Sequence, residues 1–298
     1  MLSFIQAAIV GALIWLGFAP TQLWIAPFIA LALLFHLLAD KTFRQRMSLS
    51  LLSGFTFFLL LLHWSSSYVG ATPWLILALG QAALFSLLGI LPLRSNVWGA
   101  LTFAAGFVFI ELIRMKLPFG GFGWGRIGFT QIDMTPGLYS WVGVTGVSLF
   151  IALSSLVTIS SKTRLAFVAM ILIALFTTQF TLNHTSQLRI AAIQGGVDSL
   201  GLDFNDRAMS VLNRHISQTR GVSNVDLIIW PENASDVDPI TNSAAAAAIS
   251  QLISEVQIPL VLGAVETSQG GPLNTSLYYD ATGTIRSRYV KQDLAPFG

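Results

Sequence analysis

The sequence predicts a multi-pass α-helical membrane domain followed by an α/β domain, and three observations lead to this fold class. The 298 residues are 54% hydrophobic and only 10% charged, whereas soluble domains carry about 25% charged residues. Charged residues are sparse before Leu182 and reach an ordinary density after it. From Gln187 onward, long apolar runs give way to short segments with strand or helix periodicity. We therefore expect a membrane domain at residues 1–183 and a water-facing domain at 187–298.

About seven segments of the first domain are long enough to cross a bilayer, since a spanning helix needs about 20 apolar residues. The first segment has no basic stretch before it and no small-residue cleavage site after it. We therefore predict a retained helix and not a removed signal peptide. The expected spans are residues 2–18, 23–38, 49–69, 73–93, 97–117, 139–159 and 165–182.

Basic residues in short loops predict the orientation of the spans, because they remain on the cytoplasmic side. The loops after the second, fourth and sixth spans are basic, and the loops after the first and third carry no charge. We therefore expect a cytoplasmic amino terminus, and an odd number of spans places the α/β domain outside the cytoplasm. The loop after the fifth span breaks the pattern, with Arg114, Lys116 and Arg126, and is interpreted as a functional loop.

The segment ELIRMKLPFGGFGWGRIGFTQ, residues 111–131, makes up that loop and the end of the fifth span. Glu111 and Arg114 are three residues apart, so they can pair on one helix face. Ionisable groups at membrane depth suggest a functional site, although a pair at a helix end can also extend to the interface. The run of glycines and aromatics around Trp124 is either a re-entrant segment or a long turn with interfacial aromatics.

The second domain alternates strand-like and helix-like segments, which is typical of a layered α/β domain. In such sheets, functional groups collect just past the carboxyl ends of strands. Glu232 lies there, after the apolar run DLIIW, and Lys291 follows a hairpin. Each residue also has a non-functional interpretation: Glu232 can mark an ordinary strand end, and Lys291 can be a solvated surface lysine. The expected strands are 188–196, 226–230 and 258–266, the helices 203–220 and 242–256, and the hairpin strands 277–279 and 285–290.

Two motifs of the second domain, IIWPEN at 228–233 and YVKQDLAPFG at 289–298, together resemble the carbon–nitrogen hydrolase, or nitrilase, superfamily. In the first domain, FTFFLLLLHW at 55–64, ELIR with GFGWGRIGFTQ, and WVGVTGVSLF at 141–150 are similar to one family within it, apolipoprotein N-acyltransferase. This resemblance covers nearly the whole chain. It implies an α-β-β-α sandwich, incomplete here, and a triad of glutamate, lysine and cysteine.

The reaction that the resemblance implies is a ping-pong acyl transfer. A cysteine takes an acyl chain from a phospholipid as a thioester and passes it to the amino group of a diacylglyceryl-cysteine lipoprotein. Glu232 would be the general base and Lys291 the oxyanion-stabilising donor. Trp64, Trp124, Glu111 and Arg114 would contact the lipid substrates. No metal, cofactor or nucleic-acid partner is expected, and a net charge of +2 without a basic run agrees with the last point.

The sequence departs from the family in one respect, because it contains no cysteine. Family members continue past the PFG motif with a second glutamate, the nucleophilic cysteine and a last span. We therefore expect a truncated chain that is inactive as written. Two alternatives remain open, a membrane-tethered amidase or nitrilase acting on a soluble substrate, and a non-catalytic partner of another membrane transferase.

Overall fold

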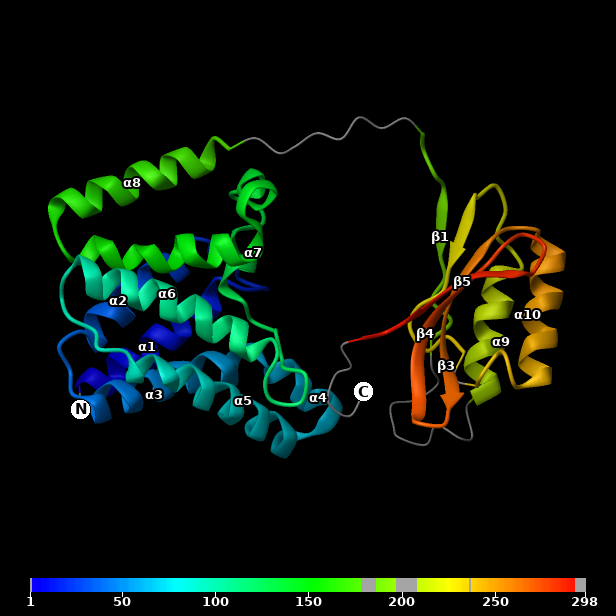
Figure 1. Ribbon diagram of the computed structural model, residues 1–298, viewed down its shortest axis with the longest axis horizontal. Helices are drawn as coiled ribbons and strands as arrows, with labels where there is room; N and C mark the ends of the chain where they lie inside the picture. The colour runs from blue at the N-terminus through cyan, green and yellow to red at the C-terminus, as the bar shows by residue number, and fades with distance from the viewer. Residues whose placement is uncertain (1, 178–185, 197–207, 236, 293–298) are drawn as a thin grey trace. The chain divides into compact units, whose positions relative to one another are not determined.

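A computed structural model describes residues 2–177, 186–196, 208–235 and 237–292 of the chain. Internal contacts divide the chain into two compact units (Figure 1). We call Met1–Leu182 the helical unit and Asn183–Leu294 the α/β unit. Each unit is described by itself.

The helical unit packs its helices around a core of large apolar side chains, in which Phe35, Phe58 and Phe103 are fully buried. Short 3-10 segments extend or follow several helices. The helices are α1 Leu2–Leu16, α2 Ala26–Leu38, α3 Phe43–Leu61, α4 Ser66–Val69, α5 Ala71–Phe85, α6 Val97–Arg114, α7 Pro136–Ala152 and α8 Ser161–Leu175. The 3-10 segments are η1 His63–Ser65, η2 Ser86–Ile90, η3 Ile127–Gln131 and η4 Leu153–Thr158.

Three helical segments within the described residues are long and apolar enough to cross a membrane: Ala71–Ile90, Val97–Arg114 and Pro136–Thr158. Leu2–Leu16 and Ala26–Leu38 are apolar but shorter. At 1.5 Å per residue, a 15-residue helix such as α1 rises about 22 Å, less than the roughly 30 Å of a hydrocarbon core. The predicted helical membrane region is confirmed in this coarser form, and the count of seven spans stays a prediction. The end of the seventh predicted span lies outside the described residues.

Polar caps fix where several of these helices begin. Thr42 and Gln45 form a reciprocal capping box at the start of α3, and Ser160 does the same with Thr163 at α8. The Asn96 side chain accepts a bond of 2.8 Å from the Gly99 N–H at the start of α6. Each such cap contributes about 1 kcal/mol by satisfying an otherwise unpaired N–H group.

The α/β unit contains one mixed sheet in the order β1-β2-β3-β4-β5. The first three strands are parallel, and the last two pairings are antiparallel. The predicted alternation and hairpin are confirmed, with a longer first hairpin strand than expected. The elements are β1 Ile190–Ala192, α9 Ala208–Thr219, β2 Leu227–Ile229, α10 Ser243–Val256, β3 Leu260–Ser268, β4 Gly271–Tyr279 and β5 Ile285–Val290.

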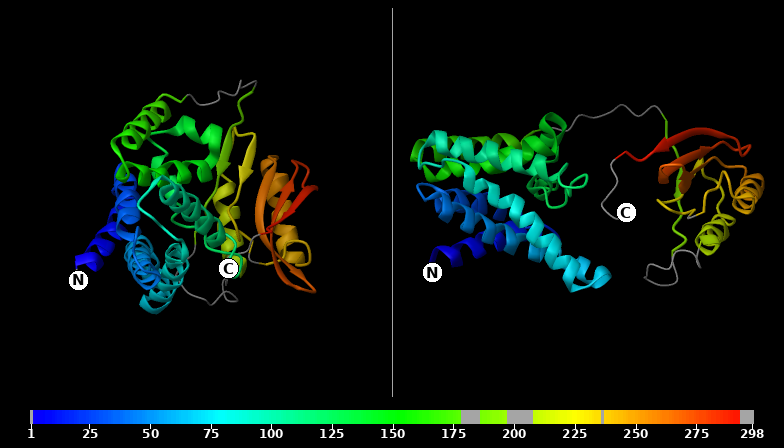
Figure 2. Two further views of the ribbon diagram at one scale, coloured as in Figure 1. Left: turned by 60° about the vertical axis from the view of Figure 1, so that its left-hand side comes forward. Right: turned by 60° about the horizontal axis from the view of Figure 1, so that its bottom comes forward.

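Both helices of the α/β unit lie side by side on one face of the sheet (Figures 1 and 2). The core between the two helices and the sheet is apolar. Ile249 of α10 and Leu212 of α9 belong to the same buried cluster as Leu262 and Leu277 of the sheet. Asn242 caps α10, and its side chain accepts a bond of 3.0 Å from the Ala245 N–H. α9 and α10 leave the opposite face of the sheet uncovered, and the candidate functional site lies on that face.

Candidate functional site

Glu232 lies three residues after the end of β2, just past the point where the sequence stops the strand. Trp230 is buried, and its indole Nε1 donates a bond of 2.9 Å to Thr219 Oγ1 of α9. Pro231 has no N–H group and cannot continue a ladder. The chain therefore leaves the sheet with Trp230 anchored, and the carboxylate of Glu232 follows two residues later.

The segment 231–235 crosses β3 closely enough to need a glycine there. A Cβ on Gly263 would lie 2.3 Å from the carbonyl oxygen of Pro231, a distance that no side chain allows. The Ser235 N–H donates to the Gly263 oxygen at 3.1 Å, and the Val265 N–H donates to the Ser235 oxygen at 3.0 Å. The backbone that carries Glu232 is therefore fixed by the close approach of Pro231 to Gly263 and by the hydrogen bonds of Ser235 to β3.

Lys291 comes to the same place from the other end of the sheet. Its Nζ donates a bond of 2.8 Å to Oε1 of Glu232. Its backbone N–H donates to the Asn274 oxygen at 2.9 Å, which extends the β4–β5 ladder by one residue. Two residues that are 59 positions apart in the chain are therefore brought together, as hypothesised from the two motifs. The Glu232 side chain is about half exposed (54%) and that of Lys291 about a third (35%).

Asn274 on β4 is a third member of the site, and the sequence analysis missed it. Its Nδ2 also donates to Oε1 of Glu232. The hydrogen bond from Lys291 lowers the pKa of Glu232 most, partial burial opposes this shift, and the bond from Asn274 adds to the lowering. Glu232 is therefore an ionised acceptor at neutral pH beside an ammonium donor.

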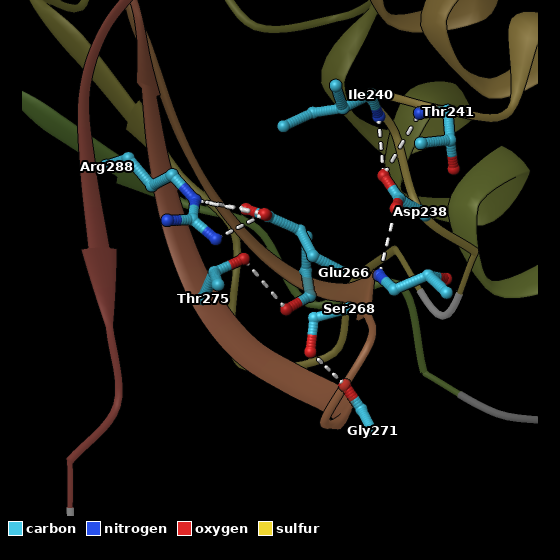
Figure 3. A network of polar contacts seen from close by, with 10 residues as sticks. Asp238, Ile240, Thr241, Glu266, Ser268, Gly271, Thr275 and Arg288 are labelled. Atoms are coloured by element: carbon cyan, nitrogen blue, oxygen red, sulfur yellow. Dashed lines mark hydrogen bonds and ion pairs between the residues drawn. The ribbon is translucent and has the colours of Figure 1, made fainter.

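A separate polar network lies on the other face of the sheet (Figure 3). Arg288 of β5 donates to both carboxylate oxygens of the buried Glu266, with Nε at 2.9–3.0 Å and Nη2 at 2.7 Å. Arg288 is paired with Leu277 in the register, so it shares the helix-covered face, because side chains alternate along a strand. Asn274 is three residues from Leu277 and points to the opposite face, with Glu232.

Asp238 belongs to this network, and its partners are three backbone N–H groups and the Thr241 side chain. Its Oδ1 accepts bonds from the N–H groups of Ile240 and Thr241, and its Oδ2 accepts one of 2.9 Å from Thr267. Burial opposes ionisation, but these donors hold the pKa of Asp238 below its ordinary value. The network fixes the end of β3 and the turn after Asp238, which is a structural task.

In the helical unit, Glu111 and Arg114 are both buried in α6, and they form hydrogen bonds with the loop and with α5. Glu111 Oε1 accepts a bond of 2.7 Å from the Ile127 N–H. Arg114 Nη2 donates to the Trp124 carbonyl oxygen at 2.8 Å, and Nε donates to Gln81 Oε1 at 2.7 Å. The spacing would allow the two side chains to pair with each other, but in the structure each bonds to the loop backbone.

Trp64 in η1 and Trp124 in the loop lie together, with ring centroids 5.6 Å apart. They line a cavity of about 420 Å³ whose other lining residues are all apolar or glycine. Gly125 is one of them; its φ is +76°, and a Cβ there would lie 2.5 Å from Leu61. The remaining lining residues are Phe18, Ala19, Leu61, Gly123 and Phe129. Such a volume falls in the usual range for small-molecule sites.

Within the described ranges, no group of three or more His, Asp or Glu side chains is placed to hold a metal ion.

Comparison with known proteins shows the family to which this sequence is similar. Residues 10–157 match the family model described as the apolipoprotein N-acyltransferase N-terminal domain. The chain is 31% identical, over 361 aligned residues, to a protein named apolipoprotein N-acyltransferase from Mycolicibacterium smegmatis, and 99% of this chain is covered. The chain belongs to the apolipoprotein N-acyltransferase family.

Other members of the apolipoprotein N-acyltransferase family give similar matches. The Vibrio vulnificus protein is 26% identical over 333 aligned positions. The Pseudomonas aeruginosa (strain PAO1) protein is 30% identical over 218 aligned positions, and this alignment covers 67% of the chain. The chain spans 58%, 64% and 42% of the M. smegmatis, V. vulnificus and P. aeruginosa proteins, respectively. Three helical segments of the described residues are long and apolar enough to cross a membrane, which agrees with the predicted membrane location.

Proposed function

We propose that the chain carries the general base and the oxyanion-stabilising group of an apolipoprotein N-acyltransferase. The reaction moves an acyl chain from a phospholipid, through a cysteine thioester, to the terminal amino group of a diacylglyceryl-cysteine lipoprotein. The observation that supports this most directly is the 2.8 Å contact between Lys291 Nζ and Glu232 Oε1. It brings together, in a family member, the two groups that such a transfer needs next to its nucleophile.

In the first half-reaction, the carboxylate of Glu232 accepts the proton of the cysteine thiol, because the thiolate is the reactive form. The thiolate attacks the ester carbonyl carbon of the phospholipid, and the carbonyl oxygen becomes an oxyanion. Lys291 has three N–H donors, so one can stay on Glu232 while another stabilises the oxyanion, which can contribute about 3–4 kcal/mol. The C–O bond then breaks, and the lysophospholipid leaves with the proton from Glu232.

In the second half-reaction, the amino group of the lipoprotein attacks the thioester carbonyl. Glu232 accepts the proton that the amine loses, the C–S bond breaks, and the released thiolate takes this proton back. The amide product and the free thiol remain. The same carboxylate therefore serves both halves, which a rigid backbone at residues 231–235 favours.

The nucleophile has to come from outside these 298 residues, because they contain no cysteine. We propose that this chain by itself forms no thioester. From the family resemblance we also propose an incomplete α-β-β-α sandwich. The mixed sheet with α9 and α10 would form one of its two layered halves.

For the membrane arrangement, we propose about seven crossings, a cytoplasmic amino terminus and an extracytoplasmic α/β domain, on the loop charges given above. Both substrates are lipids, and this arrangement keeps the reacting groups near the bilayer surface. Moving an acyl chain into water would cost about 0.8 kcal/mol per CH₂ group, so a site at the interface avoids most of this cost.

We propose that the apolar cavity at Trp64 and Trp124 takes an acyl chain. The support is its lining, which offers hydrocarbon and aromatic surface and so favours an apolar ligand. Glu111 and Arg114 contribute by holding the loop that carries Trp124. They do so through the loop backbone rather than through direct contact with lipid.

The test is to supply the chain with a carboxyl-terminal segment typical of the family, including its cysteine, and to reconstitute it in vesicles with acyl-labelled phospholipid. The expected result is a covalent acyl label that hydroxylamine removes, absent from the 298-residue chain alone. A folded, inserted and completed chain that takes no label would contradict the proposal. Hydrolysis of a soluble amide that survives Trp124→Ala, without lipid transfer, would favour the tethered amidase.

A further inference from the structure

Asn274 contacts both members of the proposed catalytic pair, each through a different group. Its side-chain Nδ2 donates to Glu232, and its main-chain oxygen accepts the Lys291 N–H at 2.9 Å. β4 lies between β3 and β5, so Asn274 connects the segment after β2 with the residue after β5. Its side chain and backbone thus add two contacts between these distant parts of the chain, beside the direct bond from Lys291 Nζ to Glu232 Oε1.

The two donors to Glu232 share one oxygen. Asn274 Nδ2 and Lys291 Nζ both bond to Oε1, and a carboxylate oxygen offers about two lone-pair sites. Oε1 is therefore saturated. Oε2 accepts no hydrogen bond from the part of the chain that the structure describes, and the side chain is about half exposed. The two oxygens of one carboxylate are thus chemically unequal.

The amide orientation follows from this pairing. An asparagine oxygen facing the carboxylate would place two acceptors against each other, so Nδ2 must be the atom that faces Oε1. An amide is neutral at every ordinary pH, and it orients Glu232 without adding a charge beside Lys291. Asparagine is also depleted in strands. Its position inside β4 therefore indicates a task that a β-branched residue could not perform.

We propose that Asn274 is a positioning residue of the acyl-transfer site: together with Lys291 it saturates Oε1 of Glu232 and leaves Oε2 as the oxygen that accepts the proton. This inference rests on the proposed function for the meaning of that proton transfer. The arrangement itself is a property of the chain and can be measured without any acyl transfer.

The measurement is a pH titration of the carboxyl carbons in the full chain, labelled with [5-¹³C]glutamate and held in lipid nanodiscs. The sequence has four glutamates, Glu111, Glu232, Glu255 and Glu266, and Glu232→Gln assigns the signal of interest. Asn274→Leu keeps the size and removes the donor, so the titration midpoint of Glu232 should move to higher pH. Asn274→Asp should move it further, because two carboxyl groups then share the site.

The matched control is Ser276→Ala, two residues along on the same face of β4, which should leave the midpoint unchanged. If Asn274→Leu does not fold, as judged by its backbone amide spectrum, the near-isosteric Asn274→Asp carries the test. A Glu232 midpoint that is the same in wild type, Asn274→Asp and the control would overturn the proposal.

The inequality of the two oxygens has its own readout in the isotope-edited infrared spectrum. Donors on one oxygen alone widen the separation between the asymmetric and symmetric carboxylate stretches. Glu255 is an internal comparison, since Gln251 donates to its Oε1 and Arg220 to its Oε2. Glu232 should show the wider separation, and Asn274→Leu should narrow it. Equal separations would refute the assignment of Oε2, whereas an absent acyl label with these spectra intact would refute only the proposed function.

Discussion

Arg114 donates a hydrogen bond of 2.8 Å from its Nη2 to the carbonyl oxygen of Trp124. This bond ties the end of α6 to the loop that lines the apolar cavity. The guanidinium also lies over the Phe58 ring, 4.4 Å from its centroid. The buried guanidinium of Arg114 therefore holds the loop in position. In this role Arg114 differs from residues that bind a ligand directly.

Replacing Arg114 by methionine should release this loop. The change keeps most of the volume but leaves the buried Gln81 oxygen and the Trp124 carbonyl without their donor, and each unsatisfied acceptor costs about 1–3 kcal/mol. We expect a lower melting temperature in nanodiscs and faster proteolysis between residues 115 and 126. Arg94→Met, at an exposed arginine, is the control. Equal melting temperatures for the two variants would argue against the role given to Arg114.

Replacing Trp64 or Trp124 by alanine should weaken acyl-chain binding with little loss of stability, because both side chains are about half exposed. The measurement is crosslinking of a phospholipid with a photoactivatable acyl chain. We expect a several-fold lower yield for each variant, since each removes a large part of the cavity wall. Trp98→Ala, at an exposed tryptophan of α6 outside the cavity lining, should crosslink as wild type does. The proposed acyl site is wrong if all three variants behave alike.

The Glu266–Arg288 pair should respond asymmetrically to mutation. Glu266 is buried, whereas the Arg288 side chain is 43% exposed. Arg288→Leu leaves the buried Glu266 carboxylate without its partner, while Glu266→Leu leaves an arginine that can turn to solvent. We expect the first change to destabilise the α/β unit more, and the double change to cost less than Arg288→Leu alone. Chemical denaturation of the four proteins forms the cycle. A larger loss for Glu266→Leu than for Arg288→Leu would contradict this account.

The Glu232–Lys291 contact should contribute to stability only when Glu232 is ionised. Its folded pKa is lowered, first by Lys291, so the contribution is present above the ordinary glutamate value of 4.5. It is lost as the pH falls through the lower folded value. Because the pair is partly exposed, we expect Glu232→Gln to cost no more than about 0–1 kcal/mol at neutral pH. The difference from wild type should vanish in acid, and a difference that grows there would contradict the stated sign.

The sequence predicted those parts of the fold that depend on local pattern. Helix periodicity at residues 242–256 predicted α10, and two strand-like runs at 277–279 and 285–290 predicted the hairpin. Glu232 and Lys291 were predicted because each lies just after a strand within a recognisable motif. Their convergence was a hypothesis that only the register of β4 and β5 could test.

The parts that were missed depend on tertiary structure. Asn274 was not predicted because the strand was expected to begin at Leu277, whereas β4 begins at Gly271. The spacing of Glu111 and Arg114 suggested a helical pair, but their partners, the Ile127 N–H and the Trp124 oxygen, come from a loop folded back on α6. No local pattern reports a loop contact of this kind.

The most direct test of the account uses the completed chain, with the family's carboxyl-terminal segment attached, and follows the rate of acyl-enzyme formation from labelled phospholipid. Glu232→Gln and Lys291→Met should each lower this rate by about 10²-fold or more. The double variant should lose little beyond the larger single loss, because groups that act as one unit are not additive. Lys162→Met, at an exposed lysine of α8, should keep the wild-type rate. Near-wild-type labelling in either Glu232→Gln or Lys291→Met would contradict the assignment of this pair as the catalytic acid–base and oxyanion groups.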